Sequence, residues 1–138
     1  MEAVAYARSK SSTKAVWTGR ILGGLAVLFL FVDAIMKLIR PLPTPVSEAA
    51  VKLGYPPQMM PVIGGVLLAC VIVHVIPRTS MLGAILLTGY LGGAVATHTR
   101  VGDPLFSHVL FPVYVGVLVW GGLFLRDECL RELLPFRR

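Results

Sequence analysis

Charged residues are scarce in this sequence. Asp, Glu, Lys and Arg together make up 14% of its 138 residues, whereas a soluble globular domain carries roughly 25%. Hydrophobic residues make up 56%, which is more apolar side chain than a water-soluble surface accommodates. This composition excludes an ordinary soluble domain and indicates a small integral membrane protein.

Cysteine is nearly absent as well. Cys70 and Cys129 are the only two, and they form no C-x-x-C pair, so the chain lacks the dithiol chemistry of membrane quinone-linked thiol oxidases. It also has no cysteine cluster for an iron–sulfur centre and no G-x-G-x-x-G loop for a nucleotide. Any redox chemistry would therefore use quinone or a bound cofactor supplied by a partner.

Four apolar segments approach the length of about 17–25 residues that crosses a bilayer core. They are approximately residues 17–39, 61–76, 80–97 and 107–125. Lipid tolerates no exposed, unsatisfied backbone, so each is expected to be a helix, and short connections make successive helices antiparallel. The predicted fold is an all-α membrane protein, an antiparallel bundle of four transmembrane helices over residues 16–138, preceded by a cytoplasmic basic tail at residues 1–15.

Basic residues are distributed unevenly over the predicted connections. Nine of the 13 Lys and Arg residues fall on the side that holds both termini, and four fall on the other side. The basic side of a membrane protein is cytoplasmic, so both termini are predicted to lie in the cytoplasm. The net charge of +6 then meets anionic lipid headgroups, and membrane lipids rather than nucleic acid are the expected partners.

The connection after the first span is rich in proline, and Pro41 is expected to stop that span. Residues 47–53 have the pattern of a short helix lying on the outer membrane surface. Ser47 is its candidate N-cap and Gly54 its C-terminal stop.

Two pairs of glycines have the G-x-x-x-G spacing. Gly89 and Gly93 lie in the third span, and Gly19 and Gly23 lie at the start of the first. Small residues let membrane helices approach closely where no hydrophobic force drives them together. Both pairs are therefore predicted to mark close helix contacts.

The ionisable and aromatic polar residues of the outer half converge on one end of the predicted bundle. Because a charge within a span costs about 2.5–3.5 kcal/mol, such residues are expected to face the bundle and to have partners. Asp33 is expected to pair with Lys37, one helical turn away, or with a basic group of the third and fourth spans if Lys37 extends to the interface. The eight residues are Asp33, Lys37, Tyr55, Tyr90, His98, Arg100, Asp103 and His108. His74 lies at the opposite end and is predicted to be interfacial or bonded within its helix.

This cluster has three interpretations. It is a structural lock between helix ends, or a pocket for a small or lipidic ligand, or a site in which two histidines hold a metal or haem. In the pocket, Asp33, Lys37, His98 and His108 are the candidate catalytic groups; the candidate ligand-binding groups are Tyr55, Tyr90, Arg100 and Asp103. The ten-residue spacing of the histidines is not a metal-site signature, so no metal is predicted.

Four stretches of the sequence are distinctive: LFVDAIMKL, LGYP, PRTSMLGAILLTGYLGGAVATHTRVGDPLFSHVLFPVY and WGGLFLRDECLRELLP. Together they resemble the DoxX-like family of small bacterial membrane proteins, from about Trp17 to Pro135. The resemblance implies a four-helix, multi-pass protein of the bacterial inner membrane. The namesake of the family is similar to a membrane subunit of a thiosulfate–quinone oxidoreductase and relatives are linked to redox stress, but many members have no assigned reaction.

Three functions follow from these observations. The first is a quinone- or redox-linked membrane subunit, with quinone favoured over haem as the cofactor. The second is a non-redox module, such as a binder, carrier or isomerase, acting on a lipophilic small molecule. The third is an accessory or assembly subunit that accompanies a membrane protein partner. The sequence leaves open whether the protein is an enzyme and whether it forms a homo-oligomer.

Overall fold

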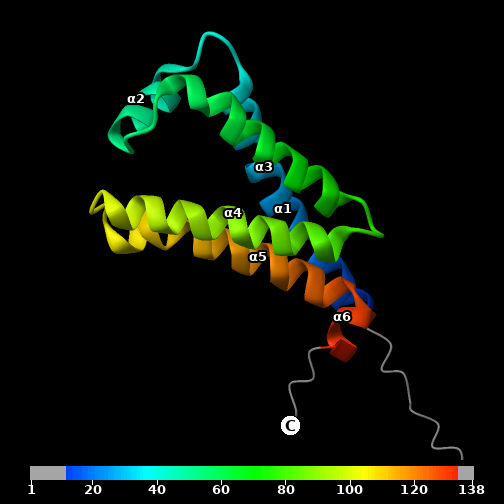
Figure 1. Cartoon of the computed structure of the whole chain (residues 1–138). Helices are drawn as coiled ribbons and strands as arrows, with labels where there is room; N and C mark the ends of the chain where they lie inside the picture. The colour runs from blue at the N-terminus through cyan, green and yellow to red at the C-terminus, as the bar shows by residue number, and fades with distance from the viewer. Residues whose placement is uncertain (1–11, 134–138) are drawn as a thin grey trace, which may run out of the picture.

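The computed structural model describes residues 12–133, and within that range every regular element is helical (Figure 1). Four of its helical segments, Thr13–Leu38, Pro57–Val75, Ser80–Arg100 and Leu105–Arg126, are long and apolar enough to cross a membrane. The prediction of a helical fold with four candidate membrane-spanning helices is therefore confirmed for the described residues. The elements in chain order are α1 (Thr13–Leu38), α2 (Thr44–Lys52), η1 (Pro57–Met59), α3 (Met60–Val75), α4 (Ser80–Arg100), η2 (Leu105–Val109), α5 (Phe111–Arg126) and α6 (Glu128–Leu133).

Helix α1 begins one turn earlier than the apolar pattern indicates. Ser12 is its N-cap, and the Ser12 hydroxyl accepts a hydrogen bond from the backbone N–H of Ala15 at 3.2 Å, which satisfies one of the free donors of the first turn. The end of the tail predicted for residues 1–15 is therefore helical, and residues 1–11 lie outside the described residues. The helix ends at Leu38, just before Pro41, as predicted.

The short helix after α1 is present, but its predicted start at Ser47 is wrong. Helix α2 begins at Thr44 with Pro43 as N-cap, because Pro45 in the first turn has no N–H to leave unpaired and already has a helical φ. Ser47 lies inside the helix and its hydroxyl donates to the Thr44 carbonyl at 2.9 Å. The predicted stop is correct, since Gly54 follows the helix with φ of +75°, a conformation that glycine adopts freely.

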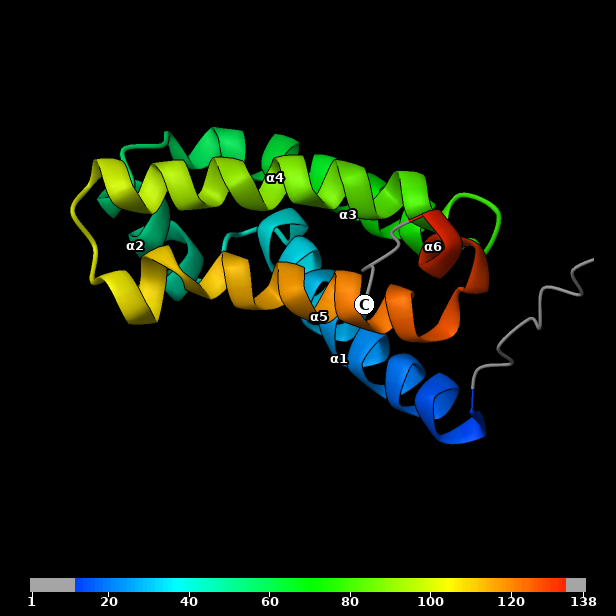
Figure 2. The ribbon, with the colours of Figure 1, turned by 90° about the horizontal axis from the view of Figure 1, so that it is seen from below.

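The four long helices form a closed ring in cross-section. Helix α1 packs against α3 and α5, and α4 also packs against α3 and α5, so the order around the ring is α1, α3, α4, α5. Figures 1 and 2 show α4 and α5 side by side, with α1 and α3 across from them. The buried centre is made by aliphatic residues from all four helices, including Leu30, Leu67, Leu87 and Val119, and by Leu130 of α6.

Glycines bring α1 and α5 into backbone contact. A Cβ atom built on Gly19 would lie 2.8 Å from the carbonyl oxygen of Gly122, and one built on Gly122 would lie 2.7 Å from the nitrogen of Gly23. No real side chain fits at these distances. The prediction of a close contact at Gly19 and Gly23 is confirmed.

Two further seams are closed in the same way. Between α1 and α3, a Cβ on Gly64 would lie 2.9 Å from the carbonyl oxygen of Ala34. Between α3 and α4, a Cβ on Gly83 would lie 2.3 Å from both the Cα and the nitrogen of His74. Three of the four seams of the ring therefore depend on a glycine.

The glycine pair of α4 behaves differently. Gly89 and Gly93 are both exposed, and a Cβ on either would meet no atom of residues 12–133 within 4 Å. The prediction that these two glycines mark a close helix contact is wrong within this chain. Their face of α4 is turned away from α3 and α5.

Replacement of Gly83 by alanine should destabilise the bundle, because the added methyl group would meet the backbone of His74. Overpacking of this kind costs about 1–3 kcal/mol. Gly89→Ala, in the same helix and with open space at its Cβ, is the matched control. Thermal melting in detergent should show a lower transition for Gly83→Ala alone, and equal curves for the two variants would contradict the α3–α4 contact.

Candidate functional site

Asp103 is the centre of the polar residues at one end of the bundle. It lies in the connection between α4 and η2, and its side chain is only 4% exposed. One carboxylate oxygen is 2.6 Å from Lys52 Nζ, and the other is 2.6 Å from His98 Nδ1. Gly102, with φ of +71°, and the hydrogen bond from Asp103 N–H to the His98 carbonyl at 3.1 Å turn the chain back so that the carboxylate reaches the histidine.

These contacts determine the charge and the tautomer of the site. The hydrogen bond from Lys52, followed by the one from His98, holds the pKa of the Asp103 carboxyl below its ordinary value. The ionised carboxylate can only accept, so His98 Nδ1 carries a proton and donates it. When the imidazole is neutral, Nε2 therefore has a free lone pair, and within residues 12–133 it has no hydrogen-bond partner.

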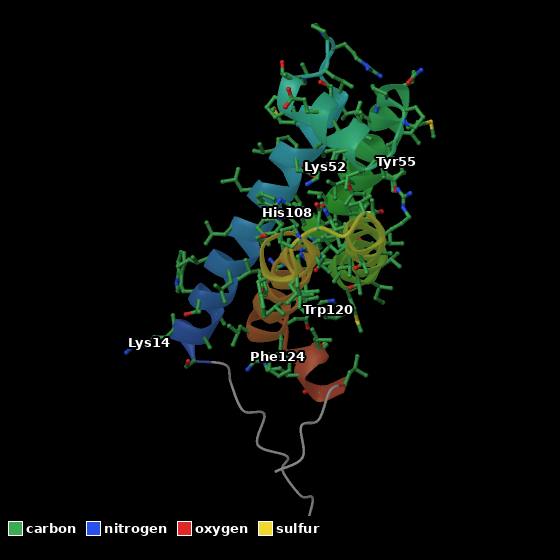
Figure 3. All side chains as sticks on the ribbon, turned by 90° about the vertical axis from the view of Figure 1, so that its left-hand side faces the viewer. Lys14, Lys52, Tyr55, His108, Trp120 and Phe124 are labelled. Carbon is green, nitrogen blue, oxygen red and sulfur yellow. The ribbon has the colours of Figure 1, made fainter. Side chains whose placement is uncertain are left out.

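His108 is the second imidazole of the site. Its ring centroid is 6.0 Å from that of His98, with 59° between the ring planes, and its Nδ1 is 2.7 Å from the hydroxyl of Ser107. It lies on η2, a single π-helical turn, and such turns are frequent at functional sites. Figure 3 looks at this end of the bundle, where His108, Lys52 and Tyr55 lie.

Residues 52–55, here called the strap, bind to the last turn of α4. Thr97 donates its hydroxyl hydrogen to the Gly93 carbonyl at 2.8 Å, so Tyr55, whose hydroxyl is 3.1 Å away, donates to Thr97. Arg100 donates to the Leu53 carbonyl at 2.5 Å. Together with the ion pair between Lys52 and Asp103, these bonds hold the strap against the C-terminal end of α4.

Asp33 and Lys37 form a pair of their own on α1. The Lys37 ammonium group donates to the Asp33 carboxylate, and the Asp33 side chain remains about one-third exposed. Of the partners predicted for Asp33, Lys37 is the one it contacts. Tyr90 is partly buried and packs against the apolar core from α4.

The eight candidate residues are thus divided. Five of them, Tyr55, His98, Arg100, Asp103 and His108, lie at the junction between the strap, α4 and η2. Asp33 and Lys37 are joined to each other and, among the residues that the structure describes, have no hydrogen bond or ion pair to that group.

Sequence reasoning missed Lys52 and Thr97, which hold Asp103 and Tyr55 respectively. The sequence indicates these two residues only through their closeness to other candidate residues. Lys52 precedes Tyr55 by about one helical turn, and Thr97 is next to His98. Once Tyr55 is placed at the outer level, Lys52 is expected at the same level.

No described group of three or more His, Cys, Asp or Glu side chains is placed to hold a metal ion. The third histidine, His74, is fully buried at the other end of the bundle. Its Nδ1 is 2.9 Å from the Ser80 carbonyl and donates to it, so His74 joins the end of α3 to the start of α4. The prediction that His74 is bonded within its own helix is wrong, because its partner Ser80 belongs to α4.

The lowered pKa of Asp103 predicts a pH dependence of stability. A carboxylate with a depressed folded pKa stabilises the fold above its unfolded pKa of about 3.9, and that contribution is lost as the pH falls further through the folded pKa. Asp103→Asn should therefore melt below the unmodified protein at neutral pH, and the two should converge below about pH 4. Glu48→Gln, at an exposed carboxylate on α2, is the control and should leave the curve unchanged; an equal melting temperature for Asp103→Asn at neutral pH would contradict the ion pair.

Comparison with known proteins adds one finding. A model of the DoxX-like family matches residues 21–122. No curated protein and no solved structure matches the chain. The matched range includes most of α1 and α5 and the whole of α2, α3, α4 and the junction around Asp103. Since this range is well over half of the 138 residues, the protein belongs to the DoxX-like family.

Proposed function

We propose that this membrane protein binds a lipid-soluble small molecule at the junction of the strap, α4 and η2, and that His98 exchanges a proton with it. A quinone or quinol is the ligand class that we propose first. The observation that supports this function is the pairing of His98 with the ionised, almost fully buried Asp103. It leaves the second nitrogen of His98 available to a ligand.

The orientation in the membrane is part of the proposal. The four spans run antiparallel through a bacterial inner membrane, with the N and C termini in the cytoplasm and the Asp103 junction at the outer face. The excess of basic residues on the side of the termini supports this orientation. The site would then be reached from the outer leaflet, where lipid-soluble ligands are dissolved.

The chemistry of His98 follows from its contact with Asp103. Nε2 can accept a hydrogen bond from a ligand hydroxyl and can take up its proton, because the carboxylate stabilises the resulting imidazolium cation. The same nitrogen, once protonated, can return the proton to a ligand carbonyl or alkoxide. His108, with its ring centroid 6.0 Å from that of His98, supplies a second imidazole to the same ligand head.

An accessory or assembly subunit is the second candidate function. The bonds between the strap and α4 favour it, because these bonds are enough to explain, without any ligand, why polar groups gather at this junction. In that case the junction stabilises the bundle and binds no ligand, and purification from native membranes should yield a stoichiometric protein partner. A ligand function instead requires a measurable effect of His98 on binding.

Cysteine labelling tests the orientation. In a Cys129→Ser background, Thr44→Cys should react with a membrane-impermeant maleimide from the outer face of intact cells. Thr79→Cys, in the turn before α4, should react only after the membrane is opened, because that turn lies at the opposite end of the bundle. The reverse labelling pattern would contradict the proposed orientation.

Removal of the imidazole tests the binding function. His98→Ala should weaken binding of a benzoquinol ring without a tail by about tenfold, because the variant loses the hydrogen bond from the quinol hydroxyl to Nε2, which contributes about 1.5 kcal/mol. Binding is measured by titration of the protein in lipid nanodiscs. Arg78→Ala, in the exposed turn at the other end, is the control; equal affinity for both variants would exclude His98 as a ligand contact. A copurified lipophilic molecule without quinone would favour the non-redox alternative.

A further inference from the structure

An apolar groove lies between α4 and α5. Its volume is about 340 Å³, which is at the lower end of the range for small-molecule sites. None of its lining residues is ionisable, and its two polar side chains are both hydrogen-bonded. Trp120 Nε1 donates to the Thr88 hydroxyl oxygen at 2.8 Å, and that hydroxyl donates to the Ala84 carbonyl at 2.8 Å. The lining residues are Thr88, Leu91, Gly92, Val95, Pro112, Val113, Gly116, Val117 and Trp120.

The groove exists because α4 and α5 meet without a close glycine contact. In the other three seams of the ring, a Cβ on the interface glycine would lie within 3 Å of the facing helix. In the α4–α5 seam, a Cβ on Gly116 would lie 3.6 Å from the Leu91 side chain, which is an ordinary contact distance. The backbones therefore stay further apart here, and Gly92 leaves the space between them unfilled.

The groove leads toward the two imidazoles. Along α4 it extends from Thr88 to Val95, about 10 Å at the helical rise. Val95 is one turn before His98 on the same helix. On the opposite wall the lining begins at Pro112, four residues after His108. A molecule lying in the groove thus has one end at Trp120 and the other at Val95 and Pro112, on the side of the groove nearer His98 and His108 along the chain.

We infer that this groove holds the aliphatic or isoprenoid tail of the ligand whose head is bound by His98. The inference rests on the proposed function and specifies the ligand class: a molecule with a neutral, hydrogen-bonding head and a tail that fills about 10 Å of groove. A phospholipid is the competing occupant, because Lys52 is paired with Asp103 but Arg100 binds only the neutral Leu53 carbonyl and keeps its positive charge. The His98→Ala variant distinguishes the two occupants, because a phospholipid chain in the groove does not depend on the imidazole.

Selectivity for the tail arises from shape. A tail that moves from lipid into an apolar groove gains little hydrophobic free energy, because both surroundings are apolar. The groove therefore favours a tail that packs against its walls over one that only partitions into the membrane. The position of the tail in the protein therefore tests the inference better than the affinity of the ligand does.

Photolabelling measures that placement. The probe is a benzoquinol ring with a decyl tail that ends in a diazirine, added to the protein in nanodiscs, and labelled peptides are identified by mass spectrometry. Labels should concentrate around Thr88 and Trp120. Gly92→Leu should remove this labelling, because Gly92 lines the groove and has open space at its Cβ position, so that the leucine side chain occupies the groove. Gly89→Leu, also open but not lining the groove, is the matched control and should label normally.

Two comparisons separate this inference from the function on which it rests. The benzoquinol ring without a tail should bind equally to Gly92→Leu and to the unmodified protein, and should bind poorly to His98→Ala. If the ring binds in that way but the tail labels Gly92→Leu as strongly as Gly89→Leu, the groove is not the tail site. If groove labelling is undiminished in His98→Ala, the groove holds bulk lipid chains and the inference is wrong. If the ring does not bind the unmodified protein at all, the proposed function fails and the inference fails with it.

Discussion

Close approach of helix backbones is the constraint on which this structure depends. In lipid no hydrophobic force drives apolar helices together, so packing contacts must hold them. Glycines provide that contact in three seams: between α1 and α5, between α1 and α3, and between α3 and α4. The fourth seam is wider and contains the groove between α4 and α5. Helices thus pack tightly where a glycine faces the backbone of its neighbour, and they leave a groove where none does.

The polar junction at the end of the bundle depends on one carboxylate. Asp103 accepts from Lys52 of the strap and from His98 of α4, so it joins two segments that are far apart in the sequence. The lysine is well exposed and the carboxylate is not, which places the positive charge at the surface and the negative charge beside the imidazole. This arrangement fixes the tautomer of His98 and leaves its other nitrogen without a hydrogen-bond partner among the residues that the structure describes. The atoms that would hold the bundle end together are therefore the same atoms that would handle a proton of the ligand.

Much of the fold was predictable from the sequence. The spans follow from runs of apolar residues, and the end of α1 and the stop of α2 follow from Pro41 and Gly54, whose effects are local. The convergence of five polar residues on one junction also followed, because chain connectivity alone sets the level of each residue along the bundle. What the sequence could not provide was the rotation of each helix about its axis.

That rotation decides which of several similar residues meet. G-x-x-x-G pairs occur in both α1 and α4, yet only the pair in α1 faces another backbone. Asp33 lies toward the same end as His98 but is turned toward Lys37. The ring order has a further consequence for biosynthesis. Helix α1 is made before α3 and α4, and its second neighbour, α5, is made after both. The glycine face of α1 therefore remains without its α5 partner in the membrane while α3 and α4 are synthesised, and the ring of these four helices closes only after α5 has been made.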